Sequence, residues 1–156
     1  MILTRAAART ITRRAGRRGL SNAAVRVEVC LDDDTELPPL TAAPGESLME
    51  LLSRSDVGDA WTDAGACGGA CACSTCRVVF LEPWRATLPE PSDDELDMLD
   101  SAAREHARNG GDEQEFLDGS RLSCQVSLTE SLDGLRVCLV GVGPNMLEVP
   151  LWLRNR

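Results

Sequence analysis

Alternating apolar and polar residues mark the first predicted strand of the chain. In the run 25–31, valine or leucine occupies every second position. Side chains on a strand point alternately to opposite faces, so this pattern predicts a strand with one buried face. A second, short strand is predicted at about 37–42, where Pro38 and Pro39 favour a sheet edge because proline cannot donate a ladder hydrogen bond. Three later apolar runs also predict strands, at 77–81, 122–128 and 135–140.

Two helices are predicted by capping boxes, in which a serine is followed three residues later by a glutamate. Residues 47–50 (Ser-Leu-Met-Glu) begin the first helix. Residues 92–95 (Ser-Asp-Asp-Glu) begin the second, which we expect to continue to about Arg104. Leu96 and Leu99 are spaced as i and i+3, so both are expected to face the core.

The remaining segments carry weaker patterns. Residues 105–118 have no clear periodicity, and we expect them to form an inserted surface loop in which His106 is solvated. The apolar run from Leu147 is expected to pack back on the domain, with Trp152 as its anchor. Together the elements predict a single α+β domain over residues 23–156.

The first twenty-two residues differ in composition from the rest of the chain. Residues 1–22 hold six of the sixteen basic residues, all arginine, and no acidic residue. An arginine-rich, acid-free N-terminus is typical of a mitochondrial transit peptide, so this segment predicts a location in the mitochondrial matrix. A basic tail that binds nucleic acid or anionic lipid is the alternative interpretation.

Removal of this leader changes the charge of the domain. Ten basic residues would face twenty-five acidic ones, a net charge of about −15 in place of −9. Such a domain repels nucleic acid and is steered towards basic protein surfaces. No apolar run approaches the roughly 20 residues that a membrane span needs. We therefore expect a monomer that neither binds nucleic acid nor spans a membrane.

The cysteines carry the most informative chemistry. Cys67, Cys73 and Cys76 lie in one glycine-rich loop with five and then two residues between them, and Cys124 stands alone further on. Four thiolates are the ligands that a binuclear iron–sulfur cluster needs. Glycine lets the backbone approach inorganic sulfide closely, since it has no side chain to interfere.

Other interpretations of the cysteines stay open at this point. Cys73 and Cys76 form a Cys-x-x-Cys pair that a structural zinc ion could use, although zinc sites usually combine two such pairs. The odd total of seven cysteines argues against a disulfide framework. Cys71 is either a small packed residue, a substitute ligand or an oxidation-prone thiol. Cys30 and Cys138 lie in predicted strands and are expected to be buried or half-buried thiols.

Three motifs, taken in their order along the chain, resemble one known family. The cysteine loop 67–76, the acidic segment 91–100 and the segment 120–125 are similar to the adrenodoxin-type (vertebrate and Isc-type) mitochondrial [2Fe–2S] ferredoxins, and the likeness runs over about 25–140. The resemblance implies a ferredoxin β-grasp: a mixed sheet with a crossing helix, a cluster-binding loop and an acidic recognition helix. It also implies a one-electron carrier that catalyses no bond breaking itself. The implied cluster ligands are Cys67, Cys73, Cys76 and Cys124.

The resemblance further implies a set of partners. Electrons would come from an NADPH-dependent flavoprotein ferredoxin reductase. They would pass to the iron–sulfur assembly machinery, which is our default, or to a haem-modifying enzyme or a cytochrome P450. The acidic helix would bind these partners through Asp93, Asp94, Glu95, Asp97 and Asp100.

Two further expectations follow from departures and alternatives. Arg77 stands where many members of this family carry histidine, and an arginine there could contact Glu82 or Asp100. The alternative function, from a different class, is a zinc-stabilised β-grasp interaction module without redox activity.

Overall fold

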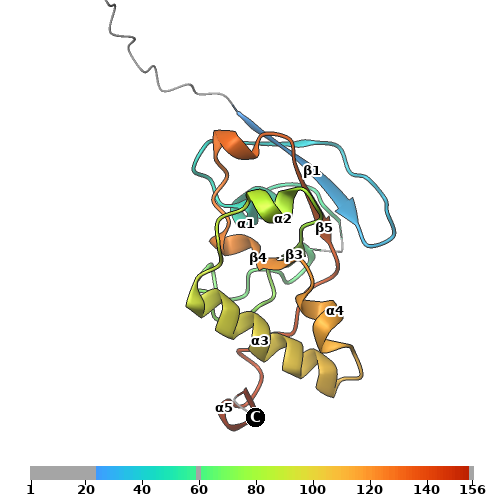
Figure 1. Cartoon of the computed structure of the whole chain (residues 1–156), viewed down its shortest axis with the longest axis vertical. Helices are drawn as coiled ribbons and strands as arrows, with labels where there is room; N and C mark the ends of the chain where they lie inside the picture. The colour runs from blue at the N-terminus through green and yellow to red at the C-terminus, as the bar shows by residue number, and fades with distance from the viewer. Residues whose placement is uncertain (1–23, 59–60, 155–156) are drawn as a thin grey trace, which may run out of the picture.

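One mixed five-stranded sheet organises the protein (Figure 1). The computed structural model describes residues 24–58 and 61–154, so the predicted transit peptide, 1–22, lies outside the described residues. The strands are β1 (Val25–Leu31), β2 (Leu40–Ala42), β3 (Arg77–Val79), β4 (Ser120–Leu122) and β5 (Leu135–Leu139). They lie in the order β2-β1-β5-β3-β4, with β1 and β5 parallel and the other neighbours antiparallel.

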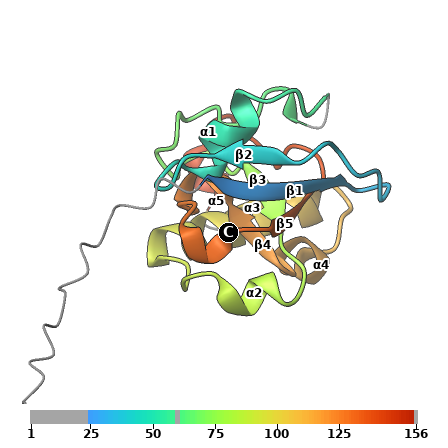
Figure 2. The ribbon, with the colours of Figure 1, turned by 90° about the horizontal axis from the view of Figure 1, so that it is seen from above.

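Helices lie on both sides of this sheet. They are α1 (Leu48–Ser53), α2 (Trp84–Thr87), α3 (Asp93–Arg108), α4 (Glu113–Leu117) and α5 (Leu151–Arg154), with 3₁₀ turns η2 (Ser123–Gln125) and η3 (Glu130–Leu132). Seen from above, α1 lies on one side of β1 and β2, and α2 lies on the other (Figure 2). The arrangement confirms the predicted α+β class. None of the helices in the described ranges combines the length and the apolar character that a membrane span requires.

The alternation in β1 forms the centre of the core, as predicted. Val25, Val27 and Val29 are buried, and the parallel register places Val27 beside Leu135 and Val29 beside Val137. Each such burial stabilises the fold by roughly 1.5–3 kcal/mol relative to an exposed side chain. The predicted edge position of β2 is also confirmed, since it pairs with β1 alone.

The capping box of α1 is complete. Oγ of Ser47 accepts a hydrogen bond from the backbone N–H of Glu50 at 3.2 Å, and the Glu50 carboxylate accepts one from the Ser47 N–H at 3.0 Å. The buried residues of this helix are Leu48, Leu51 and Leu52.

The second capping box is only half formed. Oγ of Ser92 accepts from the N–H of Glu95, but the Glu95 carboxylate turns inward instead of returning to Ser92. The buried stripe of α3 therefore starts at Glu95 and continues through Leu99, whereas Leu96 is 45% exposed. The prediction that Leu96 faces the core is wrong because Glu95 sets the rotation of the helix.

The segment 105–118 is not the surface loop that the sequence predicts. Helix α3 continues to Arg108, and a second helix, α4, follows after a short turn. Phe116 of α4 is 4% exposed and packs with Ala102, Ala103 and Met146 in a small second core. In a five-residue helix one deeply buried residue leaves no periodic pattern, so α4 cannot be predicted from periodicity.

The C-terminal segment packs back in a different way from the one expected. Trp152 is 67% exposed, so it is not an anchor. Instead, backbone carbonyls are held by two arginines: Arg108 donates to the Leu153 carbonyl at 2.7 Å, and Arg154 donates to the Val149 carbonyl at 2.8 Å. The predicted strand 122–128 is also wrong beyond residue 122, where η2 begins.

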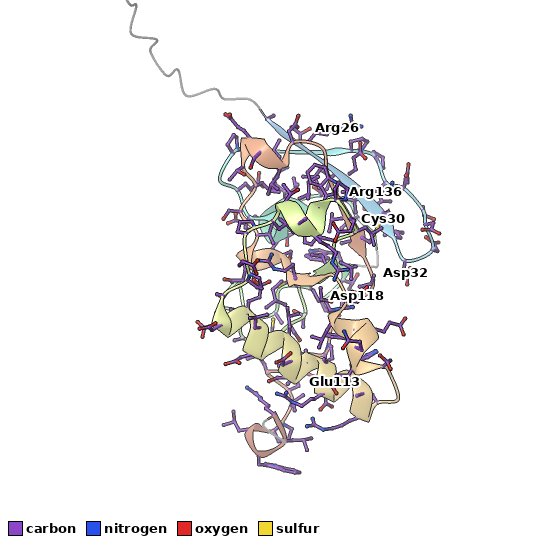
Figure 3. All side chains as sticks on the ribbon, viewed as in Figure 1. Arg26, Cys30, Asp32, Glu113, Asp118 and Arg136 are labelled. Carbon is purple, nitrogen blue, oxygen red and sulfur yellow. A yellow bond between two sulfur atoms is a disulfide. The ribbon has the colours of Figure 1, made fainter. Side chains whose placement is uncertain are left out.

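Cys30 and Cys138 form a disulfide instead of remaining thiols. They are direct register partners on the parallel strands β1 and β5, with their Cα atoms 4.7 Å apart. Cys30 lies on β1 at a distance from α4, which carries Glu113 (Figure 3). Two isolated cysteines 108 positions apart give no signal of their pairing until the strand register is known.

Candidate metal centre

The cysteine loop follows α1 and leads directly into β3. Gly65 and Gly69 have backbone φ values of +75° and +93°, which side-chain-bearing residues rarely adopt. A Cβ atom on Gly65 would lie 3.2 Å from Sδ of Met49, and one on Gly69 would lie 3.9 Å from Cβ of Cys124. Gly65 therefore lets the loop lie tightly against α1, whereas a Cβ on Gly69 would make only ordinary contacts, and glycine is favoured there by its positive φ.

Hydrogen bonds to the backbone carbonyl of Cys76 hold the fourth predicted ligand, Cys124, next to the loop. Both the N–H and the hydroxyl of Ser123 donate to the carbonyl oxygen of Cys76, at 3.0 and 2.9 Å. β4 pairs with β3 next to this point, with Leu122 opposite Arg77. Cys124 therefore lies beside Cys76, although forty-seven residues separate them in the sequence.

The four predicted ligands lie in two pairs. The side chain of Cys73 lowers the pKa of Cys67, and the side chains of Cys76 and Cys124 shift each other's pKa, so each pair lies within interaction distance. A binuclear cluster places two thiolates on each iron, whereas structural zinc takes four ligands around one point. The donor set thus fits a [2Fe–2S] cluster.

The two sulfurs of the pair Cys76 and Cys124 differ in pKa. Contact with the Cys76 thiol, opposed by burial, lowers the pKa of Cys124 to about 6, and Gln125 and the Cys71 backbone N–H add to the effect. The same contact, together with burial, raises the pKa of Cys76. Burial acts to raise the pKa of Cys67, but backbone donors from the loop outweigh it and the pKa is lowered. Cys124 is the thiolate of its pair, and a thiolate is the form that binds metal.

A hydroxyl also reaches one of these sulfurs. Oγ1 of Thr75 lies 3.1 Å from Sγ of Cys73 and accepts a hydrogen bond from the Ala66 N–H at 3.0 Å. Either group can be the donor in this contact while Cys73 is a thiol, and once Cys73 is a thiolate only the Thr75 hydroxyl can donate. Thr75 was not among the predicted site residues, and its position next to a predicted ligand in the sequence was the one available signal. Gln125 belongs to the segment 120–125, which carries part of the family resemblance.

Cys71 belongs to neither pair. It has a φ of +54°, and its own backbone N–H contacts the sulfur of Cys124. Burial and then the nearby negative charges of Cys124, Glu95 and Asp94 raise the pKa of its thiol to about 11. A protonated, half-buried thiol outside both pairs fits the prediction of a packed residue.

The acidic helix presents four of the five predicted docking residues. Asp93, Asp94, Asp97 and Asp100 are exposed along α3. Glu95 is 1% exposed and bound to Arg121, so it is not available to a partner. The prediction for Glu95 is wrong, because counting acidic residues cannot distinguish an outward from an inward carboxylate.

Sequence comparisons place the chain among known proteins. No family model matches it. It is 45% identical over 95 residues to the mitochondrial adrenodoxin homolog of Saccharomyces cerevisiae, which covers 61% of this chain and 46% of the yeast protein. It is 33% identical over 109 residues to terpredoxin of Pseudomonas sp, covering 70% and 91% of the two chains. It is 35% identical over 114 residues to the 2Fe–2S ferredoxin of Rickettsia felis, covering 73% and 88%.

Solved structures agree with these relatives. A reduced putidaredoxin variant from Pseudomonas putida matches with a TM-score of 0.57 and 30% identity, over 74% of this chain and 95% of that one. The ferredoxin from Rhodopseudomonas palustris HaA2 matches with a TM-score of 0.57 and 31% identity, over 72% and 93%. The chain belongs to the adrenodoxin-type [2Fe–2S] ferredoxins. The ferredoxin is therefore a β-grasp protein and an electron carrier whose cofactor is a [2Fe–2S] cluster.

Arg77 of this ferredoxin does not make the contacts expected from its sequence position. Its guanidinium lies 4.0 Å from the centroid of the Phe116 ring, and it donates to the Phe116 carbonyl at 2.8 Å and to Oγ of Ser120 at 2.8 Å. Burial lowers the pKa of Arg77 to about 10. The expected contacts with Glu82 or Asp100 do not form, because α4 occupies the space beside Arg77. The residue thus ties α4 to the strand that leaves the cysteine loop.

Proposed function

We propose that this ferredoxin holds its cluster through Cys67 and Cys73 on one iron and Cys76 and Cys124 on the other. The pairing of the four thiols carries this assignment. Two thiolates on each iron are what the cofactor requires, and a bound [2Fe–2S] cluster supplies reversible one-electron transfer. The zinc-stabilised module is set aside, since the chain belongs to a family of electron carriers.

Single electrons enter, in this proposal, from an NADPH-dependent flavoprotein ferredoxin reductase. Support comes from a solved covalent complex of putidaredoxin reductase with putidaredoxin, whose chain matches with a TM-score of 0.54 and 30% identity, over 77% of this chain and 98% of that one. The exposed strip Asp93, Asp94, Asp97 and Asp100 gives this chain a negative face for a basic partner. Charges of this kind mainly set the rate of encounter and the orientation of the partners.

The acidic strip lies close to the proposed cluster loop. A cavity of about 700 Å³ is lined by Ala70 and Cys71 of the loop and by Asp94 and Asp97 of α3. A partner that docks on these aspartates is thereby held against the loop. Electron transfer requires the two redox centres to come close together. A small interface is sufficient to hold them at a short distance.

The mitochondrial matrix is the proposed location, and residues 1–22 are the proposed transit peptide. The arginine-rich composition of this segment and the similarity to a mitochondrial yeast protein support the proposal. The iron–sulfur assembly machinery is our proposed acceptor. A haem-modifying enzyme and a cytochrome P450 are the other acceptor classes to test.

Stopped-flow reduction by an NADPH-dependent flavoprotein ferredoxin reductase tests the docking part of the proposal. The double variant Asp97→Asn/Asp100→Asn should be reduced about tenfold more slowly at low salt, and the difference should shrink as salt rises. The double variant Asp32→Asn/Asp33→Asn removes the same charge from the exposed turn after β1 and is the matched control. Equal slowing in both variants would show that net charge, not the α3 strip, guides the encounter.

A further inference from the structure

Gln125 contacts a sulfur of the proposed centre with its side chain. Its Nε2 atom lies 3.2 Å from Sγ of Cys124 and 3.4 Å from the carbonyl oxygen of Gly69. Both neighbours are hydrogen-bond acceptors, so the NH₂ end of the carboxamide faces them and its oxygen points away. The side chain thus bridges the cysteine loop and the segment that carries Cys124.

The backbone on both sides of Gln125 is fixed. Ser123 is held to the Cys76 carbonyl by its N–H and its hydroxyl. The carbonyl of Val126 accepts from the Leu48 N–H at 2.9 Å, and Val126 is buried. The carboxamide is therefore a preorganised donor, placed before any charge arrives on the sulfur.

The chemistry of a donor on a ligand sulfur differs between the two redox states. Reduction adds one electron and no proton to the centre, so negative charge on the sulfurs increases. A hydrogen bond to a charged acceptor is stronger than one to a less charged acceptor. An N–H directed at Cys124 consequently stabilises the reduced state more than the oxidised state, and contacts of this kind are one lever on cluster potential.

We propose that Gln125 is a positioning residue that raises the reduction potential of the cluster through its hydrogen bond to Cys124. This rests on the proposed assignment of Cys124 as a ligand. A further donor to this sulfur, the N–H of Cys71, belongs to the backbone and is not removed by changing a side chain. Gln125 donates from an exposed side chain, so a substitution at this position can change the reduction potential of the cluster without repacking the core of the protein.

Redox titration of cluster-loaded protein tests the proposal. Gln125→Met keeps the length of the side chain, continues to cover the sulfur and removes the donor. At the midpoint potential of the unsubstituted protein, the ratio of reduced to oxidised Gln125→Met protein should be about fivefold lower than the same ratio in the unsubstituted protein. Gln125→Glu should lower the ratio further, since it adds a negative charge beside the sulfur. Gln114→Met changes the chain's other glutamine, which is exposed on α4, and should leave the midpoint unchanged.

A second readout separates tuning from a purely structural role. Loss of the hydrogen bond should shift the iron–thiolate stretching bands of the resonance Raman spectrum in Gln125→Met and leave them unchanged in Gln114→Met. An unchanged midpoint in Gln125→Met would overturn the proposal, and so would loss of the cluster from both Gln125 variants, which indicates a structural role. A Cys124→Ser variant that keeps the native cluster and potential would instead contradict the ligand assignment itself.

Discussion

Glu95 and Arg121 form a bidentate ion pair that joins the acidic helix to the strand before Cys124. Oε1 of Glu95 accepts from Nε of Arg121 at 2.8 Å, and Oε2 accepts from Nη2 at 3.0 Å. Oε1 also accepts from the N–H of Leu122 at 2.8 Å, and the fourth bond of the network runs from Nη1 of Arg121 to the carbonyl of Pro89. An acidic residue that the sequence assigns to docking therefore has a structural role.

Substitution of Glu95 should be costly. Glu95→Ala leaves the Leu122 N–H without its acceptor and the largely buried Arg121 charge with only the Pro89 carbonyl, which should lower the free energy of unfolding by about 3–5 kcal/mol. Glu95→Gln keeps an acceptor for Leu122 and should cost less. Urea unfolding followed by circular dichroism measures both values. Glu90→Ala removes an exposed glutamate and should change stability by less than about 0.5 kcal/mol. Similar midpoints for Glu95→Ala and Glu90→Ala would show that the ion pair does not hold α3.

Arg77 should matter for α4. Arg77→Met removes the contact with the Phe116 ring and the bonds to the Phe116 carbonyl and Ser120, at a cost of about 2 kcal/mol. Hydrogen exchange should then become faster in α4 than in β1. Arg77→Lys keeps the charge but not the planar donor set, so it should give an intermediate result. Arg85→Met breaks only an exposed ion pair with Asp118 and is the control. Unchanged exchange in α4 would refute this role of Arg77.

Regular patterns made much of the fold predictable from the sequence. Strict alternation of apolar and polar residues predicts strand β1. A capping box, which is fully formed in the structure, predicts helix α1. The spacing of Cys67, Cys73 and Cys76, together with the isolated Cys124, was sufficient to indicate the family that the comparisons show.

The errors share a physical cause: each depends on contacts between segments far apart in the sequence. Glu95 is drawn inward by Arg121, which also turns Leu96 outward. Phe116 buries a short helix by packing on α3. The pairing of Cys30 with Cys138 requires the parallel register of two strands. Local patterns report propensity and cannot report such partners.

The disulfide between β1 and β5 should stabilise the oxidised protein. Cys138→Ser should lower the free energy of unfolding by about 2–4 kcal/mol without reductant, because the bond constrains a long loop in the unfolded chain. With dithiothreitol present, the two proteins should unfold at nearly the same denaturant concentration. Thiol titration of the unfolded, cluster-free protein should give five free thiols before reduction and seven after it. Seven thiols before reduction would show that the pair does not oxidise.

Cys71 should be dispensable for the cluster and slow to react. Cys71→Ser should keep the full iron and sulfide content. With a pKa of about 11 the Cys71 thiol is protonated at neutral pH, so its alkylation by iodoacetamide should accelerate about tenfold per pH unit up to about pH 11. Peptide mass mapping of the folded, cluster-free protein measures this rate. Rapid alkylation at pH 7, or loss of iron from Cys71→Ser, would indicate a ligand or an activated thiol.

Metal analysis combined with electron paramagnetic resonance tests the central claim most directly. After anaerobic purification of the full chain, we expect two irons and two labile sulfides per protein, and a one-electron signal on reduction with dithionite. Cys67→Ser and Cys124→Ser should each lose the native signal. A colourless protein that binds zinc and takes up no iron under cluster reconstitution would contradict the account.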